Sequence, residues 1–265
     1  MRLRSLVINV GAIALSAAIV LGLQLPRLNQ RISGQTAAET QKALQEEATR
    51  LNLIKQLPPK GFGFNNMIAN FAFLQFLQYF GDDVARNQFQ TGYSLSPHYF
   101  ENIIARDPRF ISAYIYLSSS VSMFAGSPSE AIALYSRGLS SLDPKVQPDS
   151  YLIWRYKAID QLLFLGDDKG ARESYLKAAD WAEQAIKLGT VSHREDGLKT
   201  VAELSRQSAQ WLEQDRDLSK ARIAAWSFVL QNAVDQKTVA IIAKELDRLG
   251  MKIDIKDDRP IIAPK

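Results

Sequence analysis

The fold prediction starts from one stretch, Gly166-Asp167-Asp168-Lys169-Gly170-Ala171-Arg172-Glu173-Ser174-Tyr175-Leu176-Lys177-Ala178-Ala179. A small residue is followed by an aromatic residue four positions later and by a second small residue three positions after that. Small residues at this spacing let a neighbouring helix approach closely, and the aromatic side chain fills the gap beside them. The same order occurs one unit earlier in the chain, at Ala131, Tyr135 and Gly138.

Helix boundaries recur on both sides of this stretch. Asp107-Pro108 and Asp143-Pro144 lie 36 residues apart, each closing a helical pattern. Capping boxes, in which a serine and a glutamate satisfy each other's backbone amides, are expected at Ser127–Glu130 and Ser192–Glu195. Ser96-Pro97 has the order of a cap residue followed by proline at the first helical position. Helices are expected over Ile111–Phe124, Pro128–Ser141, Asp149–Leu165, Lys169–Leu188, His193–Gln214, Leu218–Gln231 and Lys237–Leu249.

The chain resembles the tetratricopeptide repeat (TPR) family, whose unit of about 34 residues forms two antiparallel helices. The resemblance is carried first by Asp149–Ala179, then by Phe110–Pro144 and Lys199–Leu230, with Gly61–Pro108 as a divergent opening pair. The Trp-Leu-Gly of a strong first helix is missing, and Phe110–Gly126 is one residue longer than the consensus. The resemblance implies an all-α fold, with an α-helical solenoid of TPR-like antiparallel helix pairs over residues 61–250.

Composition excludes several classes of site. The chain of 265 residues has no cysteine, which removes disulfides, zinc fingers, iron–sulfur clusters and thiol nucleophiles. Its net charge of +4 comes entirely from Arg2, Arg4, Arg27 and Arg31, since the remaining residues hold 28 basic and 28 acidic side chains. A balanced domain argues against a nucleic-acid partner.

The N-terminus predicts a membrane anchor over residues 1–31, with residues 5–25 in the membrane. From Ser5 to Pro26 there is no charge, and about twenty helical residues cross the roughly 30 Å of a bilayer core. The alternative is a cleaved signal peptide, in which Ser16-Ala17-Ala18 supplies the small residues near the cleavage site. Counting positive charges favours a domain on the periplasmic or thylakoid-lumenal side rather than in the cytoplasm.

Two segments flank the predicted repeats. Residues 32–60 are expected to form a stalk or linker helix that ends at Pro58-Pro59. Residues 251–265 are expected to form an extended C-terminal tail, at whose start, Met251–Ile255, apolar and polar residues alternate weakly.

Gly61–Gly81 is uncharged and the most aromatic part of the chain. It fits either a buried first helix of the domain or a helix at the membrane interface.

The sequence shows no catalytic machinery. Asp82-Asp83 and Asp167-Asp168 follow glycines at predicted helix ends, where aspartate caps the next helix, and Asp257-Asp258 forms a third pair. The two histidines, His98 and His193, each fall in the first turn of a helix without a second histidine at ligand spacing. We therefore expect no enzyme activity, no cofactor, no metal and no small-molecule substrate.

The function that the resemblance implies is protein binding in a concave groove lined by the first helix of each pair. The residues expected to face it are Ser112, Ile115, Ser119 and Met123 in one helix, and Ile153, Tyr156, Asp160 and Phe164 in the next. Among them, Ser112, Ser119, Met123, Tyr156 and Asp160 are the candidate partner-binding residues, while Ile115, Ile153 and Phe164 also fit packing between repeats.

These features together predict a single-pass membrane-anchored scaffold or assembly factor whose partner is a membrane-complex subunit. The architecture is similar to that of the anchored TPR assembly factors of photosystem I. By analogy, a photosynthetic complex in the thylakoid is a candidate for the partner. The alternative from another class is a secreted periplasmic enzyme or ligand-binding protein released by signal-peptide cleavage.

Overall fold

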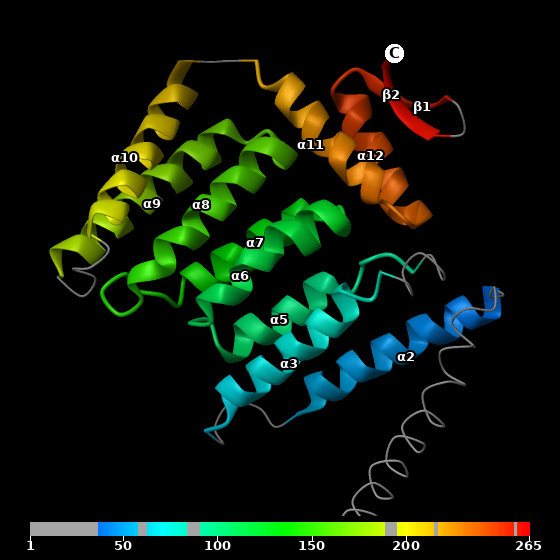
Figure 1. The fold of residues 1–265 in the computed structure, drawn as a ribbon, viewed down its shortest axis with the longest axis horizontal. Helices are drawn as coiled ribbons and strands as arrows, with labels where there is room; N and C mark the ends of the chain where they lie inside the picture. The colour runs from blue at the N-terminus through cyan, green and yellow to red at the C-terminus, as the bar shows by residue number, and fades with distance from the viewer. Residues whose placement is uncertain (1–36, 58–62, 84–90, 189–194, 215–216, 257–258) are drawn as a thin grey trace, which may run out of the picture.

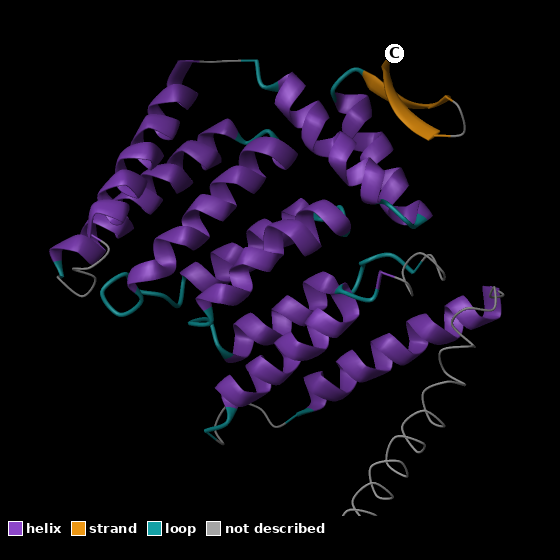
Figure 2. Cartoon of the chain, viewed as in Figure 1, coloured by secondary structure: helices purple, strands orange, loops and turns teal. Residues whose placement is uncertain are grey.

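Antiparallel helix pairs build most of the computed structural model, of which 77% is helical (Figures 1 and 2). The structure describes residues 37–57, 63–83, 91–188, 195–214, 217–256 and 259–265. Several predicted features lie outside the described residues: the anchor, the start of the stalk, residues 192–194 of the second capping box, and Asp257-Asp258. Within the described part, no helix is both long enough and apolar enough to cross a membrane.

The segment with the repeated small–aromatic–small order forms two helix pairs. The first pair is α6 (Ile111–Leu117), continued by the π-helical segment η1 (Ser118–Phe124), and α7 (Pro128–Leu139). A 3-10 turn, η2 (Pro148–Ser150), leads into the second pair. This pair consists of α8 (Tyr151–Asp160), continued by the π-helical η3 (Gln161–Leu165), and α9 (Asp168–Lys187). The predicted helix positions are thus confirmed to within a few residues here.

The repeated small residues lie at close helix–helix contacts, as expected. Ala171 and Ala178 are fully buried, and a Cβ added to Gly138 of α7 would meet the ring of Tyr114 in α6. The two Asp-Pro positions also match, since Asp107 and Asp143 each accept a hydrogen bond from the backbone N–H two residues later. The repetition read from the sequence is therefore a repetition of local structure.

In the part of the chain that the structure describes, three helices precede these pairs: α2 (Ala37–Gln56), α3 (Asn65–Phe80) and α5 (Ser96–Arg106). Helix α3 packs against α5, and both contact α2. Leu51 and Ile54 of α2 are buried in the main apolar core, and Arg106 donates a hydrogen bond of 2.8 Å to the Leu57 carbonyl. The end of the segment expected to be a stalk therefore packs as part of the helical domain.

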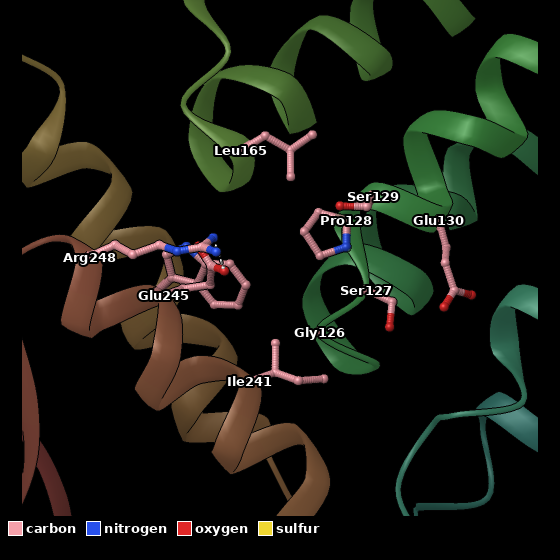
Figure 3. Close-up of a pocket in the computed structure, with 10 residues that line it drawn as sticks. Gly126, Ser127, Pro128, Ser129, Glu130, Leu165, Ile241, Glu245 and Arg248 are labelled. Atoms are coloured by element: carbon pink, nitrogen blue, oxygen red, sulfur yellow. Dashed lines mark hydrogen bonds and ion pairs between the residues drawn. The ribbon is translucent and has the colours of Figure 1, made fainter.

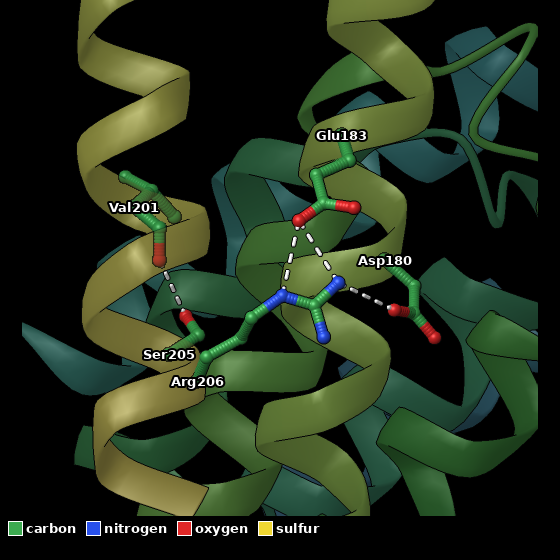
Figure 4. Close-up of polar contacts among 5 residues, drawn as sticks. All are labelled: Asp180, Glu183, Val201, Ser205 and Arg206. Carbon is green, nitrogen blue, oxygen red and sulfur yellow. Dashed lines mark hydrogen bonds and ion pairs between the residues drawn. The ribbon is translucent and has the colours of Figure 1, made fainter.

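The C-terminal half continues with α10 (Glu195–Trp211), the short 3-10 turn η5 (Leu212–Gln214), α11 (Ser219–Asn232) and α12 (Gln236–Arg248). Helix α10 lies along α9, where Arg206 bonds both Asp180 and Glu183 (Figure 4). These side chains are 38 to 48% exposed, so the ion pairs add little stability. The buried alanines of α9 and the apolar side chains of α10 hold the two helices together.

The last fifteen residues correct the expectation of an extended tail. Strands β1 (Met251–Lys256) and β2 (Arg259–Pro264) form an antiparallel hairpin that pairs Met251 with Pro264 and Lys256 with Arg259. Ile253 and Ile262 face each other and pack onto the apolar cluster of α11 and α12. The described part of the fold is therefore not purely helical. The apolar side chains of the hairpin cover the last helix pair, α11 and α12.

Helix starts confirm the aspartate cap at Asp167 and correct the serine cap at Ser127. Asp167 accepts a hydrogen bond of 2.9 Å from the Gly170 N–H at the start of α9, as expected. Ser127 occupies the cap position of α7, but its hydroxyl donates back to the Ala125 carbonyl, and its own N–H bonds the Val121 carbonyl. With that amide already satisfied, no reciprocal capping box forms.

The start of α5 needs a similar correction. The capping residue is Leu95 rather than Ser96, because the Leu95 carbonyl accepts the first helical hydrogen bonds, from the N–H groups of His98 and Tyr99. Ser96 is fully buried inside the first turn.

Candidate protein-binding face

The first helices of the two central pairs lie side by side, and a buried polar cluster joins them. Asp160, at the end of α8, accepts hydrogen bonds of 2.5 Å from the hydroxyls of Ser118 and Ser122 in η1. Both carboxylate oxygens are used. The π-helical turns follow α6 and α8 at equivalent places, so the serines and Asp160 meet where each helix changes its winding.

Asp160 is fully buried, which corrects the expectation that its carboxylate faces a partner. Burial raises the pKa of Asp160 to about 6, and the two serine hydrogen bonds partly oppose this rise. Burial also raises the pKa of Tyr135 well above its usual value, and the nearby Asp160 carboxylate adds to this. The cluster thus serves as a contact between neighbouring helix pairs.

The remaining predicted residues fall into three groups by exposure. Ser112 and Ile115 are exposed on α6, and Ile115 keeps 46% of its surface in solvent. Ser119 is half-buried, and its hydroxyl donates to the Tyr116 carbonyl at 3.2 Å. Met123 and Tyr156 are half-buried and pack against separate apolar clusters. Ile153 and Phe164 are buried, and the Phe164 ring contacts Trp226.

The face that stays open to a partner is therefore narrower than predicted. It consists of Ser112, Ile115 and Ser119 at helical spacing on α6 and η1, together with the half-buried Tyr156 on the neighbouring helix α8. We call these four residues the α6–α8 face. An exposed isoleucine between two serines can contact an apolar side chain of a partner, and none of the four residues is charged.

A hollow of about 240 Å³ lies at the start of α7, across from α12 (Figure 3). Ser127, Pro128 and Ser129 approach it from one side and Ile241 from the other. Glu245 and Arg248 of α12 form an ion pair of 2.6 Å at its rim. The remaining charged residue that lines the hollow is Glu130, at the start of α7.

A second hollow, of about 430 Å³, lies between α8 and α9. Lys157 sits 5.0 Å from the centre of the Trp154 ring, and partial burial lowers the lysine pKa. Glu173 and Asp180 of α9 also line this hollow. Its charges are mixed and its mouth is open, which is typical of a surface groove between helices.

Among the described candidates, His98 and the pairs Asp82-Asp83 and Asp167-Asp168 do not form one site, and His193 lies outside the described part of the chain. His98 is exposed beside Glu101, and Asp83 accepts a hydrogen bond from the Tyr93 hydroxyl at 3.3 Å. Among the described residues, no group of three or more histidine, aspartate or glutamate side chains could hold a metal ion.

The outer side of α3 bears on the two alternatives that the sequence leaves open for Gly61–Gly81, a buried first helix or a helix at the membrane interface. Phe64, Met67, Phe71 and Leu74 are all exposed there. Their spacing of three, four and three residues marks one side of a helix, and the sequence alone left open whether that helix is buried in the domain or lies at a membrane interface.

No family model matches the chain, and neither a curated protein nor a solved structure is significantly similar to it.

Proposed function

We propose that this chain is a membrane-anchored, TPR-like scaffold or assembly factor. Residues 1–31 are its anchor, with residues 5–25 in the membrane, and the helix pairs hold a protein partner, a subunit of a membrane complex, through the α6–α8 face. The observation that carries the proposal is the side-by-side arrangement of α6 and α8, which leaves Ile115 46% exposed between two polar neighbours. Pairs of helices stacked in this way present an extended surface for a partner.

The uncharged stretch from Ser5 to Pro26 supports the membrane part of this proposal. An anchor of this kind keeps the helical domain beside the bilayer, where the domain can hold a subunit of a membrane complex. The photosynthetic setting rests on architectural similarity and is the most specific form of the same proposal.

Partner capture tests the binding part. The tagged full-length chain is solubilised from native membranes in mild detergent and purified together with its partners. We expect Ile115→Glu to reduce the amount of the main co-purified membrane protein at least about tenfold, roughly 1.4 kcal/mol, because a charge replaces an apolar contact. The matched control is Leu204→Glu, since Leu204 of α10 is 47% exposed and outside the proposed face.

Equal capture by wild type and Ile115→Glu would remove the α6–α8 face from the proposal. Capture that is lost equally in both variants would show that the effect is not specific to this face.

A further inference from the structure

Helix α3 is apolar on two opposite sides. Its inner side is buried against the domain through Ala69, Ala72, Phe76 and Tyr79. Its outer side carries four large apolar side chains with exposed fractions of 48 to 62%: Phe64, Met67, Phe71 and Leu74. We call these four the α3 stripe.

The α3 stripe is continuous and uncharged. Residues spaced by three and four positions lie above one another on a helix, so the four side chains form one row along α3. No charged residue occurs between Gly61 and Gly81, and the exposed polar neighbours of the stripe are the amides Asn66, Asn70 and Gln78. The row therefore offers apolar contact and neutral hydrogen-bonding groups, without charge for a partner to complement.

The size of the stripe argues against a second copy of the chain. With the exposed fractions above, four such side chains present roughly 450 Å², whereas each partner of a stable complex contributes about 800 Å². A patch of this size still exceeds what scattered surface residues present, and patches of several hundred Å² mark sites of contact.

The position of α3 in the chain points to a bilayer as its partner. Eleven residues, 26–36, separate the predicted membrane segment from α2, so α2 begins within about 40 Å of the end of that segment. Helix α2 contacts α3 and α5, so α3 packs beside the helix that follows the predicted anchor in the chain. Phenylalanine, methionine and leucine lie readily among the upper acyl chains, and amide groups bond with headgroups and water.

We propose that the α3 stripe lies in the membrane interface beside the anchor and fixes the orientation of the helical domain on the bilayer. This inference rests on the proposed anchor and adds a second contact with the same membrane. Because α3 has no basic residue, the contact depends on apolar insertion and is independent of anionic lipid.

The absence of cysteine allows a direct test on the full-length protein. Phe71→Cys places a single thiol in the stripe at a site that is 48% exposed, and Leu204→Cys places one on α10 at a site that is 47% exposed. Each variant is labelled with an environment-sensitive fluorophore and reconstituted into vesicles whose lipids carry bromine on the upper acyl chain. Flotation first selects the protein that is inserted in the vesicles.

We expect the label at Phe71 to shift to the blue and to lose at least about half of its fluorescence in brominated vesicles, with the same loss in neutral and anionic lipids. The label at Leu204 should remain unquenched. Vesicle-bound protein with an unquenched label at Phe71 would overturn the α3 contact while leaving the anchor in place.

The other outcomes are also decisive. A full-length chain that does not float with vesicles contradicts the anchor, and the inference falls with it. Quenching at both sites would mean that the whole domain lies on the bilayer without a defined orientation, which contradicts a specific α3 contact. An efficient disulfide between two Phe71→Cys chains, with no quenching, would instead assign the stripe to a second copy.

Discussion

Asp160 shows how one residue joins two helix pairs. Its carboxyl group lies in the core, and each oxygen accepts a hydrogen bond from a serine hydroxyl. Both oxygens therefore have a partner, but ionising the buried group costs free energy. Burial raises its pKa to about 6, compared with 3.8 for a free aspartate. An acid whose pKa is higher in the folded state stabilises the fold when it is protonated and loses that contribution as the pH rises through 6.

We predict that the free energy of unfolding decreases by about 2 to 3 kcal/mol between pH 4 and pH 7 because of Asp160. Asp160→Asn, which keeps the shape and stays neutral, should remove this part of the pH dependence. Urea unfolding of both proteins at several pH values measures it. Identical pH profiles for wild type and Asp160→Asn would contradict the assignment of the raised pKa to this residue.

Ala171 tests the small–aromatic–small pattern at a single position. We predict that Ala171→Leu lowers the free energy of unfolding by about 1 to 3 kcal/mol, because three extra carbon atoms are forced into a filled helix–helix contact. Ala221→Leu on the exposed side of α11 is the control and should change stability little. Thermal melting that is unchanged for Ala171→Leu would remove this alanine from the packing argument.

At the scale of elements, α6 and α7 approach so closely that only glycine fits at position 138. A Cβ there would meet the Tyr114 ring, which is buried, stacked on Tyr135 and bonded through its hydroxyl to the Pro108 carbonyl. The ring therefore has little room to move. Gly138 and Ala178 occupy the equivalent third position of the small–aromatic–small order in successive pairs.

We predict that Gly138→Ala destabilises the protein by about 1 to 2 kcal/mol, since the steric cost exceeds the usual helical advantage of alanine. Gly197→Ala is the matched control on α10, where an added Cβ meets nothing within 4 Å. It should stabilise by about 0.5 to 1 kcal/mol. Opposite signs in chemical denaturation are the expected result, and stabilisation by both variants would contradict the close contact.

The elements could largely be predicted because their signals are local. The order of small and aromatic residues placed α7 and α9, and Asp167 marked the start of α9. The π-helical turns η1 and η3 could not be predicted from apolar periodicity, since they depend on which backbone bonds the packed helices allow. The extra residue in Phe110–Gly126 was a sign of irregular winding there, and η1 lies within that segment.

The candidate face was harder to predict than the helices, because helical spacing assigns residues to a side but not to a depth. Ser112 and Ile115 are exposed, whereas Asp160 and Phe164, on the predicted face of the next helix, are buried. The winding of η1 brings Ser118 and Ser122 towards Asp160 and draws its carboxylate inside. Because each helix was considered without its neighbours, the sequence predicted too many exposed residues on the binding face.

On the scale of the whole molecule, the domain begins earlier and ends later than the repeats alone suggest. Helix α2 closes one end of the stack through Leu51 and Ile54, and the β1–β2 hairpin covers the other through Ile253 and Ile262. Stacked repeats need such terminal elements because each end would otherwise expose an apolar face. Along α3 this cover is incomplete, and the α3 stripe remains open.

The central claim is that this helical domain is held at a membrane by the first residues of its own chain. Ser5–Pro26 carries no charge, and Arg2, Arg4, Arg27 and Arg31 flank it. A span of this kind resists extraction because apolar side chains stay in the bilayer when electrostatic contacts are removed.

Alkaline carbonate extraction of native membranes tests this claim most directly. We predict that the full-length chain stays in the membrane pellet and that the chain lacking Met1–Arg31 appears in the supernatant, since the α3 stripe alone is an interfacial contact. Full-length protein in the carbonate supernatant would contradict the account.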